Sequence, residues 1–167
     1  GGVTSLQVLP GSANLFGGRG VTLKNVPART VQGMKFPDAP YTLKMACGEN
    51  PKRVYGERKS QPMSRMGSIA KLRAAFIQAR QYAYDQRAFD AEYTEWKQKY
   101  DAFKAGEAGA KDPGKEPRRG DRNLGLETLA DVLEGKIKVH IHCYRADEML
   151  LMLSLAEELG FKVSSFH

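Results

Sequence analysis

The chain has 167 residues, of which 41% are hydrophobic and 27% charged, a balance typical of a globular domain that can bury a core. The sequence contains no run of about 18 apolar residues, which is the pattern that predicts a membrane-spanning helix. Lysine and arginine total 26 against 19 acidic residues, a net charge of +7. Much of this excess lies in the loop-like residues 52–59 and 111–122, so solvated loops explain it better than a nucleic-acid surface does.

The first part of the chain predicts strands separated by irregular sequence. Residues 3–9 are rich in β-branched and apolar side chains and stop at a Pro-Gly pair, which predicts a buried strand. The glycine-dense residues 11–20 predict a loop, and this loop lacks the Gly-Lys-Ser/Thr ending of a Walker phosphate loop. A short strand over 21–26 and a second core strand over 41–47 follow.

A long helical pattern begins near Ser68. Its aromatic residues repeat at steps of four and three, which predicts an aromatic seam on one face. The seam consists of Phe89, Tyr93, Trp96, Tyr100 and Phe103. We expect it to pack on the domain or on a partner helix, with base stacking as the alternative. The helix should end before Gly106, and the Gly-, Pro- and charge-rich residues 106–120 predict a mobile loop.

The last third of the chain alternates helices and strands. Residues 123–134 predict a helix, 136–143 a strand, 146–159 an apolar helix and 161–166 a final strand, with a glycine after each helix. Helices that cross over between strands imply parallel pairing, so the predicted fold class is α/β.

Cys47 and Cys143 each follow a strand-like run and lack a CxxC partner, which predicts buried small residues rather than a zinc ribbon or a disulfide framework. The chain begins at Gly1 without an initiator Met and stops at His167 after an apolar run, so we expect both ends to be truncations. The cellular compartment is therefore unknown from this sequence.

All three histidines lie on the last two predicted strands. His140 and His142 are two residues apart and share one face of a strand, and His167 ends the next strand. If the strands are neighbours, His142 and His167 meet at the strand ends, where parallel α/β folds collect their functional groups. Two imidazoles there are half of a zinc site, and the alternative is that either ring caps a strand or bonds in the core.

Two residues near the second core strand are candidates for a third ligand. Glu49 lies just past the strand end, after Gly48, and Lys44 lies within the strand, where a charge is unusual. A buried lysine can pair, extend to the surface or be chemically modified. From the residues alone, a loop carboxylate and a paired lysine are the simpler interpretation.

Three segments carry a resemblance to a known family: residues 2–14, residues 43–56 with 64–67, and residues 139–148. They resemble the amidohydrolase superfamily, in the branch described as imidazolonepropionase-like. The resemblance implies that residues 1–167 are part of a (β/α)8 TIM-type barrel, roughly its third to sixth strands, with a helical excursion over 66–122. It also implies hydrolysis of amide or other C–N bonds in a small-molecule or peptide-like substrate, with one or two divalent metal ions, zinc being expected.

The resemblance assigns roles to individual residues. His142 matches the metal ligand on the fifth barrel strand, and His167 falls at the sixth-strand position. The fourth-strand ligand, acidic or a carboxylated lysine in the family, falls on Glu49 or Lys44, and we favour Glu49 because it lies nearer the mouth. The resemblance further implies substrate contacts, which we expect from Tyr144, Arg145 and Asn14.

The departures from the family pattern matter as much as the matches. The strand-one His-x-His pair and the strand-eight Asp, the usual general base, have no counterpart in this chain, and His140 with His142 lies on the wrong strand to replace that pair. We therefore expect the isolated chain to be inactive and to bind metal weakly. The alternatives are a basic nucleic-acid-binding module and an interaction protein whose long helix pairs with a partner, for instance in a homo-oligomer.

Overall fold

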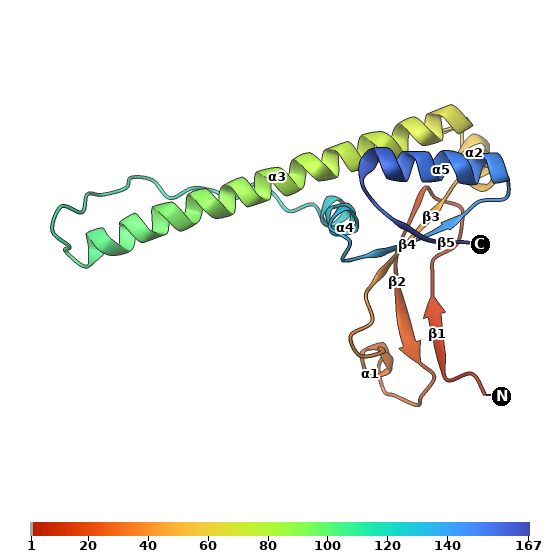
Figure 1. The fold of residues 1–167 in the computed structure, drawn as a ribbon, viewed down its shortest axis with the longest axis horizontal. Helices are drawn as coiled ribbons and strands as arrows, with labels where there is room; N and C mark the ends of the chain where they lie inside the picture. The colour runs from red at the N-terminus through yellow and green to blue at the C-terminus, as the bar shows by residue number, and fades with distance from the viewer. Residues whose placement is uncertain (1) are drawn as a thin grey trace.

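The computed structural model describes residues 2–167, which form one five-stranded sheet with helices against one of its faces (Figure 1). The strands lie in the order β1 (Ser5–Val8), β2 (Phe16–Lys24), β3 (Thr42–Ala46), β4 (Lys138–His142) and β5 (Val163–Phe166). The β1–β2 and β2–β3 pairs are antiparallel, whereas β3, β4 and β5 are parallel. The parallel pairing expected from crossover helices is thus confirmed for the last three strands, while their numbering within a complete barrel stays a prediction.

Within residues 2–167, five helices connect the strands. They are α1 (Val31–Met34), α2 (Glu49–Glu57), α3 (Arg65–Lys104), α4 (Leu124–Leu133) and α5 (Ala146–Leu159). The chain passes from β3 to β4 through α2, α3 and α4, and from β4 to β5 through α5. Figure 1 shows α5 beside the first part of α3, whose remainder projects far beyond the sheet. Among the helices of residues 2–167, none combines the length and hydrophobicity that crossing a bilayer requires.

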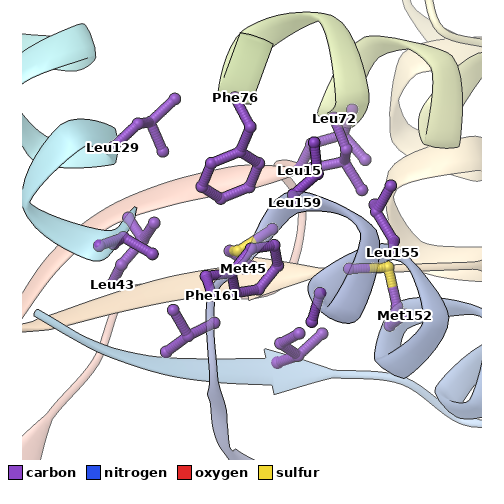
Figure 2. Packing of buried hydrophobic residues seen from close by; sticks show 14 of the residues in the cluster. Leu15, Leu43, Met45, Leu72, Phe76, Leu129, Met152, Leu155, Leu159 and Phe161 are labelled. Carbon is purple, nitrogen blue, oxygen red and sulfur yellow. The ribbon is translucent and has the colours of Figure 1, made fainter. Parts of the chain in front are cut away.

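The core lies between the sheet and the helices. Side chains alternate along a strand, so every second residue of β3 and β4 faces the helices. Those residues meet a layer of large apolar side chains from α3, α4 and α5 (Figure 2). The most buried members, each 2% exposed or less, include Leu43, Met45, Leu72, Phe76, Val139, Ile141, Met152 and Leu155. The alternation leaves the polar residues Lys44, His140 and His142 on the opposite face.

The first two strands differ from the sequence prediction. The strand expected over residues 3–9 is present as β1, Ser5–Val8, but the prediction that it is buried is wrong, because all four residues are exposed. It pairs with β2 alone and lies at the edge of the sheet, away from the helical layer (Figure 1). The prediction of a loop over 11–20 is wrong in its second half, where β2 begins at Phe16 and contains a bulge between Phe16 and Gly18. Gly20 leaves no room for a side chain, because a Cβ there would meet Thr42 and the Val8 carbonyl oxygen.

The long helix α3 agrees with the predicted pattern and extends it. Ser64 caps its N-terminus by accepting a hydrogen bond from the Gly67 N–H at 3.0 Å, and the helix ends at Lys104, before Gly106 as predicted. Ser68, Leu72, Phe76 and Ala79 face the core. The helix begins at Arg65, three residues before Ser68, because the Ser64 side chain satisfies one of the free N–H groups of its first turn.

The aromatic seam of α3 packs against the chain's own returning segment, residues 106–120. Trp96 donates its indole N–H to the Gly114 carbonyl oxygen at 3.1 Å. Arg119 lies over the Phe89 ring at 4.7 Å and forms an ion pair with Asp90. The returning segment, expected to be mobile, thus contacts α3 at Phe89, Asp90 and Trp96.

Helix α2 was not predicted. Residues 48–51 contain Gly and Pro and suggested the start of a loop, yet α2 begins directly after β3, with Gly48 as its N-cap residue at φ 67°. Pro51 lies in its first turn, where a missing N–H has no cost because those groups have no partner within the helix. Glu49 is consequently a helix residue and not a loop residue.

Cys47 and Cys143 directly follow β3 and β4, and each is 3% exposed, which confirms the prediction of buried small residues. The two residues, 96 positions apart in the sequence, are joined by a disulfide with a Cα–Cα distance of 5.2 Å. The parallel register of β3 and β4 brings them together, and no spacing motif in the sequence indicated the pairing.

Candidate functional site

The sheet face opposite the core carries a group of basic side chains toward the C-terminal ends of the parallel strands. In the β3–β4 register, Lys44 pairs with His140 and Ala46 pairs with His142. His167 directly follows β5, and its N–H donates to the Ile141 carbonyl oxygen at 3.1 Å, which ties it to β4. One amine and three imidazoles thus gather on a single face.

His142 and His167 lie together, as their positions on neighbouring strands predicted. Their ring centroids are 6.0 Å apart with the planes inclined at 65°. Burial, followed by the positive charges of Lys44, His142 and His140, lowers the pKa of His167. A lowered pKa favours the neutral imidazole, which is the form that binds a metal ion. Whether the two rings are metal ligands stays a prediction.

Asn50, on the first turn of α2, connects three polar groups at this point. Its Nδ2 donates to Ser12 Oγ at 2.8 Å and lies 3.2 Å from His142 Nε2 and 3.4 Å from Tyr144 Oη. An amide nitrogen is only a donor, so His142 Nε2 accepts and the proton of the neutral ring is on Nδ1. The Tyr144 ring meets the His142 ring edge-on at 4.6 Å.

Sequence reasoning missed Asn50 and Ser12. Each lies inside a segment that carries the family resemblance, but neither is a usual metal ligand and nothing in its spacing singles it out. Only the fold shows that α2 turns Asn50 back toward β4 and that the loop after β1 brings Ser12 to the same place.

His140 is held by two hydrogen bonds. Its Nε2 lies 3.1 Å from Gln7 Nε2, which can only donate, and its Nδ1 lies 2.7 Å from Ser165 Oγ. The ring is therefore neutral, with its proton on Nδ1 pointing at the serine. Burial and the charge of Lys44 lower the pKa of His140, which agrees with this neutral form. Both ring nitrogens are occupied, so His140 is bonded within the fold, one of the alternatives that the sequence left open.

Lys44 is 5% exposed, and its Nζ donates to the Pro10 carbonyl oxygen at 3.0 Å. Burial lowers the pKa of its ammonium group. No ion pair joins it to an acidic residue within the part of the chain that the structure describes, residues 2–167. The expected paired lysine is thus bonded to a backbone carbonyl group, and it faces the imidazoles.

Glu49 points to a different set of partners. Its carboxylate lies 3.2 Å from Lys52 Nζ and 3.3 Å from the guanidinium of Arg65 at the start of α3. The hydrogen bond with Lys52, and the charges of Lys52 and Arg65, lower the pKa of Glu49. Lys52 lies on α2 and Arg65 on α3, so the Glu49 carboxylate is bound by helix residues and not by the group of histidines.

The three predicted substrate contacts occupy different places. Tyr144 is 63% exposed beside His142, which leaves its hydroxyl available to a ligand. Asn14 accepts a hydrogen bond from the Tyr55 hydroxyl at 3.2 Å and so links the loop after β1 to α2. Arg145 binds Asp147 through two hydrogen bonds of 2.9 Å at the start of α5. The structure brings Tyr144 to the histidines, while Asn14 and Arg145 are bound to other residues.

The residues present fit part of a metal site. His142 and His167 place two imidazoles on one face, with the Asn50 amide hydrogen-bonded to Nε2 of His142. Of the two candidates for a third ligand, Lys44 is buried on this same face. Among residues 2–167, no group of three or more His, Cys, Asp and Glu side chains is close enough to hold a metal ion. Two imidazoles are fewer donors than a bound zinc ion takes, so a metal site at this face would need further ligands.

Comparison with known proteins shows what this chain is similar to. No family model matches the chain. The amidohydrolase tasK of Hapsidospora irregularis is 34% identical over 176 residues, which cover 100% of this chain and 16% of that protein. The crystal structure of an amidohydrolase from Thermotoga maritima MSB8 is 36% identical with a TM-score of 0.73, over 98% of this chain and 36% of its own.

The two comparisons agree on what the chain corresponds to. It spans about a sixth of the curated relative and about a third of the solved structure, and its curled α/β sheet matches part of the latter. The resemblance to amidohydrolases inferred from the sequence is therefore confirmed, and the chain is homologous to one part of each of these two proteins. The imidazolonepropionase-like branch stays a prediction.

Proposed function

We propose that this chain supplies part of the active site of a metal-dependent hydrolase that cleaves C–N bonds of amide or peptide-like substrates. The observation that supports the proposal best is the pair of imidazoles at adjacent strand ends, with His142 and His167 ring centroids 6.0 Å apart. Relatives named amidohydrolases support the reaction class. A divalent ion, zinc in our proposal, would supply Lewis acidity toward the scissile carbonyl and lower the pKa of the attacking water.

We assign His142 and His167 as ligands of that ion. The Asn50 amide nitrogen keeps Nε2 of His142 without a proton, and in our assignment the metal ion would replace this hydrogen bond on the Nε2 lone pair. The lowered pKa of His167 favours the same neutral form. His140 is excluded from this role in our assignment because Gln7 and Ser165 occupy both of its ring nitrogens.

For the third ligand of this chain we favour Lys44 over Glu49. Lys44 lies on the histidine face, whereas Lys52 and Arg65 hold the Glu49 carboxylate. An amine is a poor ligand while protonated, but burial lowers the pKa of Lys44 and so increases the fraction of free amine. The free amine adds to carbon dioxide and loses a proton, which yields a carbamate with two oxygen donors.

The neighbouring polar groups would orient the substrate. Tyr144 is exposed next to His142, and the amide of Asn50 lies between Tyr144 and Ser12. Hydrogen bonds from these groups can fix a polar substrate beside the metal ligands. A residue that acts as general base is not part of our assignment, and we propose that the chain by itself is inactive and binds metal weakly.

The full-length product of the gene that encodes this chain provides the test. We expect it to contain stoichiometric zinc or another divalent ion and to release amine from some members of a panel of N-acylated and cyclic amides. His142→Ala and His167→Ala should lose both metal and hydrolysis, while His140→Ala should keep the metal. A purified protein without metal, together with unchanged hydrolysis in His142→Ala, would refute the proposal.

A further inference from the structure

A buried carboxylate lies behind the candidate site, on the first turn of α5. Glu148 is 7% exposed, and its Oε1 accepts a hydrogen bond from Arg65 Nε at 2.5 Å. Its Oε2 is fully buried and has no hydrogen-bond partner among residues 2–167. A buried carboxylate with one free oxygen is costly, so this position calls for an explanation beyond a surface ion pair.

The free oxygen lies against Gly48. A Cβ on Gly48 would collide with the carboxyl carbon and both carboxylate oxygens of Glu148, and the φ of +67° also disfavours any side chain there. Gly48 is the N-cap residue of α2 and provides no side-chain hydrogen bond to the free N–H groups of that helix. The negative charge of Glu148 therefore lies where the positive end of the α2 dipole favours it.

Arg65 connects this contact to a second residue of α2. Its guanidinium donates to Glu148 at 2.5 Å and to Glu49, the first residue of α2, at 3.3 Å. The first turns of α2, α3 and α5 are thus joined by four residues, which we call the clamp: Gly48, Glu49, Arg65 and Glu148.

The clamp holds the turn that carries Asn50. Asn50 is the second residue of α2, and its amide reaches His142 Nε2 at 3.2 Å. The backbone of the same region is fixed by a hydrogen bond of 2.8 Å from the Cys47 N–H to the His142 carbonyl oxygen. A displacement of the first turn of α2 would therefore move Asn50 relative to the His142 ring while the strands stay in place.

We propose that the clamp is a positioning device, in which Glu148 and Arg65 act through α2 and Asn50 to set the orientation and tautomer of the His142 ring. Its use in catalysis rests on the proposed function, but the orientation of the ring does not. The test therefore uses the 167-residue chain without metal, so that its failure is separate from a failure of metal binding.

The first variant is Glu148→Gln. It keeps the shape of the side chain but removes the negative charge that pairs with Arg65. An uncharged amide then replaces the carboxylate at the positive end of α2. Nuclear magnetic resonance of the imidazole nitrogens should show one tautomer of His142 in the wild type, with Nε2 unprotonated. In the variant we expect a shift of both ring-nitrogen signals of His142 toward a mixture of tautomers, and a shift of the Asn50 side-chain amide.

Two internal controls make the result specific. His140, held by Gln7 and Ser165, should keep its signals. Glu158→Gln is the matched variant, because Glu158 also joins α5 to α3, through hydrogen bonds of 2.7 and 2.8 Å with Arg73, but does not contact α2. It should leave the His142 signals unchanged.

Arg65→Lys provides a second variant in case Glu148→Gln does not fold. A lysine keeps the charge but cannot reach Glu148 and Glu49 with the separate donors of a guanidinium. We expect the same direction of shift at His142. Unchanged His142 signals in a folded Glu148→Gln or Arg65→Lys variant would overturn the proposal, and so would an equal shift in Glu158→Gln.

Discussion

Asn50 and His142 are 92 residues apart in the sequence, yet Asn50 Nδ2 lies 3.2 Å from His142 Nε2. The contact depends on a short helix that begins directly after β3 and on a histidine at the end of the adjacent strand β4. The contact leaves Nε2 of His142 unprotonated. The ring lies on the sheet face opposite the core, where Lys44 and His167 also lie.

The choice between Lys44 and Glu49 can be tested by metal content. In the full-length gene product, we expect Lys44→Ala to weaken zinc binding at least about 10-fold, the range seen when a ligand's surroundings are disturbed. Glu49→Gln should have little effect, because its carboxylate is engaged by Lys52 and Arg65. Lys44→Glu places a carboxylate at the same position and should recover part of the zinc binding that Lys44→Ala loses. Loss of zinc in Glu49→Gln but not in Lys44→Ala would reverse the assignment.

Phe76 of α3 should contribute strongly to the stability of the hydrophobic core. It is 0% exposed, and its ring stacks on Phe161 with a centroid distance of 4.6 Å and meets Phe16 edge-on at 5.8 Å. Phe76→Ala should reduce the free energy of unfolding by about 3–5 kcal/mol, because it removes buried surface and leaves a cavity. Tyr84→Ala on the same helix, where the side chain is 63% exposed, is the control and should change it little. Urea denaturation measures both, and equal effects would contradict the packing described.

The returning segment should depend on Trp96. This side chain stacks with Tyr100 at 4.9 Å and donates to the Gly114 carbonyl oxygen at 3.1 Å. In Trp96→Ala we expect faster amide hydrogen exchange across residues 106–120, with unchanged exchange in β3 and β4. Mass spectrometry of peptic fragments measures this directly. Equal exchange in the wild type and the variant would show that the seam does not hold the segment.

Glu127 of α4 should contribute to stability in a defined pH range. Its carboxylate accepts two hydrogen bonds of 2.8 Å from Arg122 and one of 3.1 Å from the Tyr82 hydroxyl. The hydrogen bond from Arg122 is the main cause that lowers the pKa of Glu127 from 4.5 to about 2. The unfolded carboxyl group therefore binds a proton more readily than the folded one, and the contribution is present above pH 4.5 and is lost as the pH falls toward about 2.

The variant Glu127→Gln removes this contribution. Its free energy of unfolding should lie below that of the wild type above pH 4.5, and the two curves should converge as the pH falls toward about 2. Glu116→Gln, at an exposed position of the returning segment, is the control and should follow the wild type throughout. A difference between wild type and Glu127→Gln that grows with acidity would contradict the sign of the effect.

The sequence predicted best the elements whose signals are local. The apolar helix over 146–159 coincides with α5, because Gly160 can adopt the left-handed conformation that ends it. The proximity of His142 and His167 was also predictable, because crossover connections make successive strands parallel and adjacent.

The missed features depend on tertiary contacts. Residues 3–9 have the composition of a buried strand, but burial depends on what covers a strand, and no helix covers β1. Asn50 and Glu148 gain their importance from a helix, α2, that a Gly- and Pro-containing segment did not reveal. Local propensity could not predict α2, because contacts with Arg65 and Glu148 hold its first turn.

The central claim is that His142 and His167 are ligands of one divalent ion, and anomalous X-ray diffraction at the zinc edge tests it most directly. Crystals of the full-length gene product grown with zinc should show an anomalous peak about 2.0–2.1 Å from a ring nitrogen of each of the two residues. His140 should remain bonded to Gln7 and Ser165. A zinc peak at His140 or at Glu49, with none shared by His142 and His167, would contradict the claim.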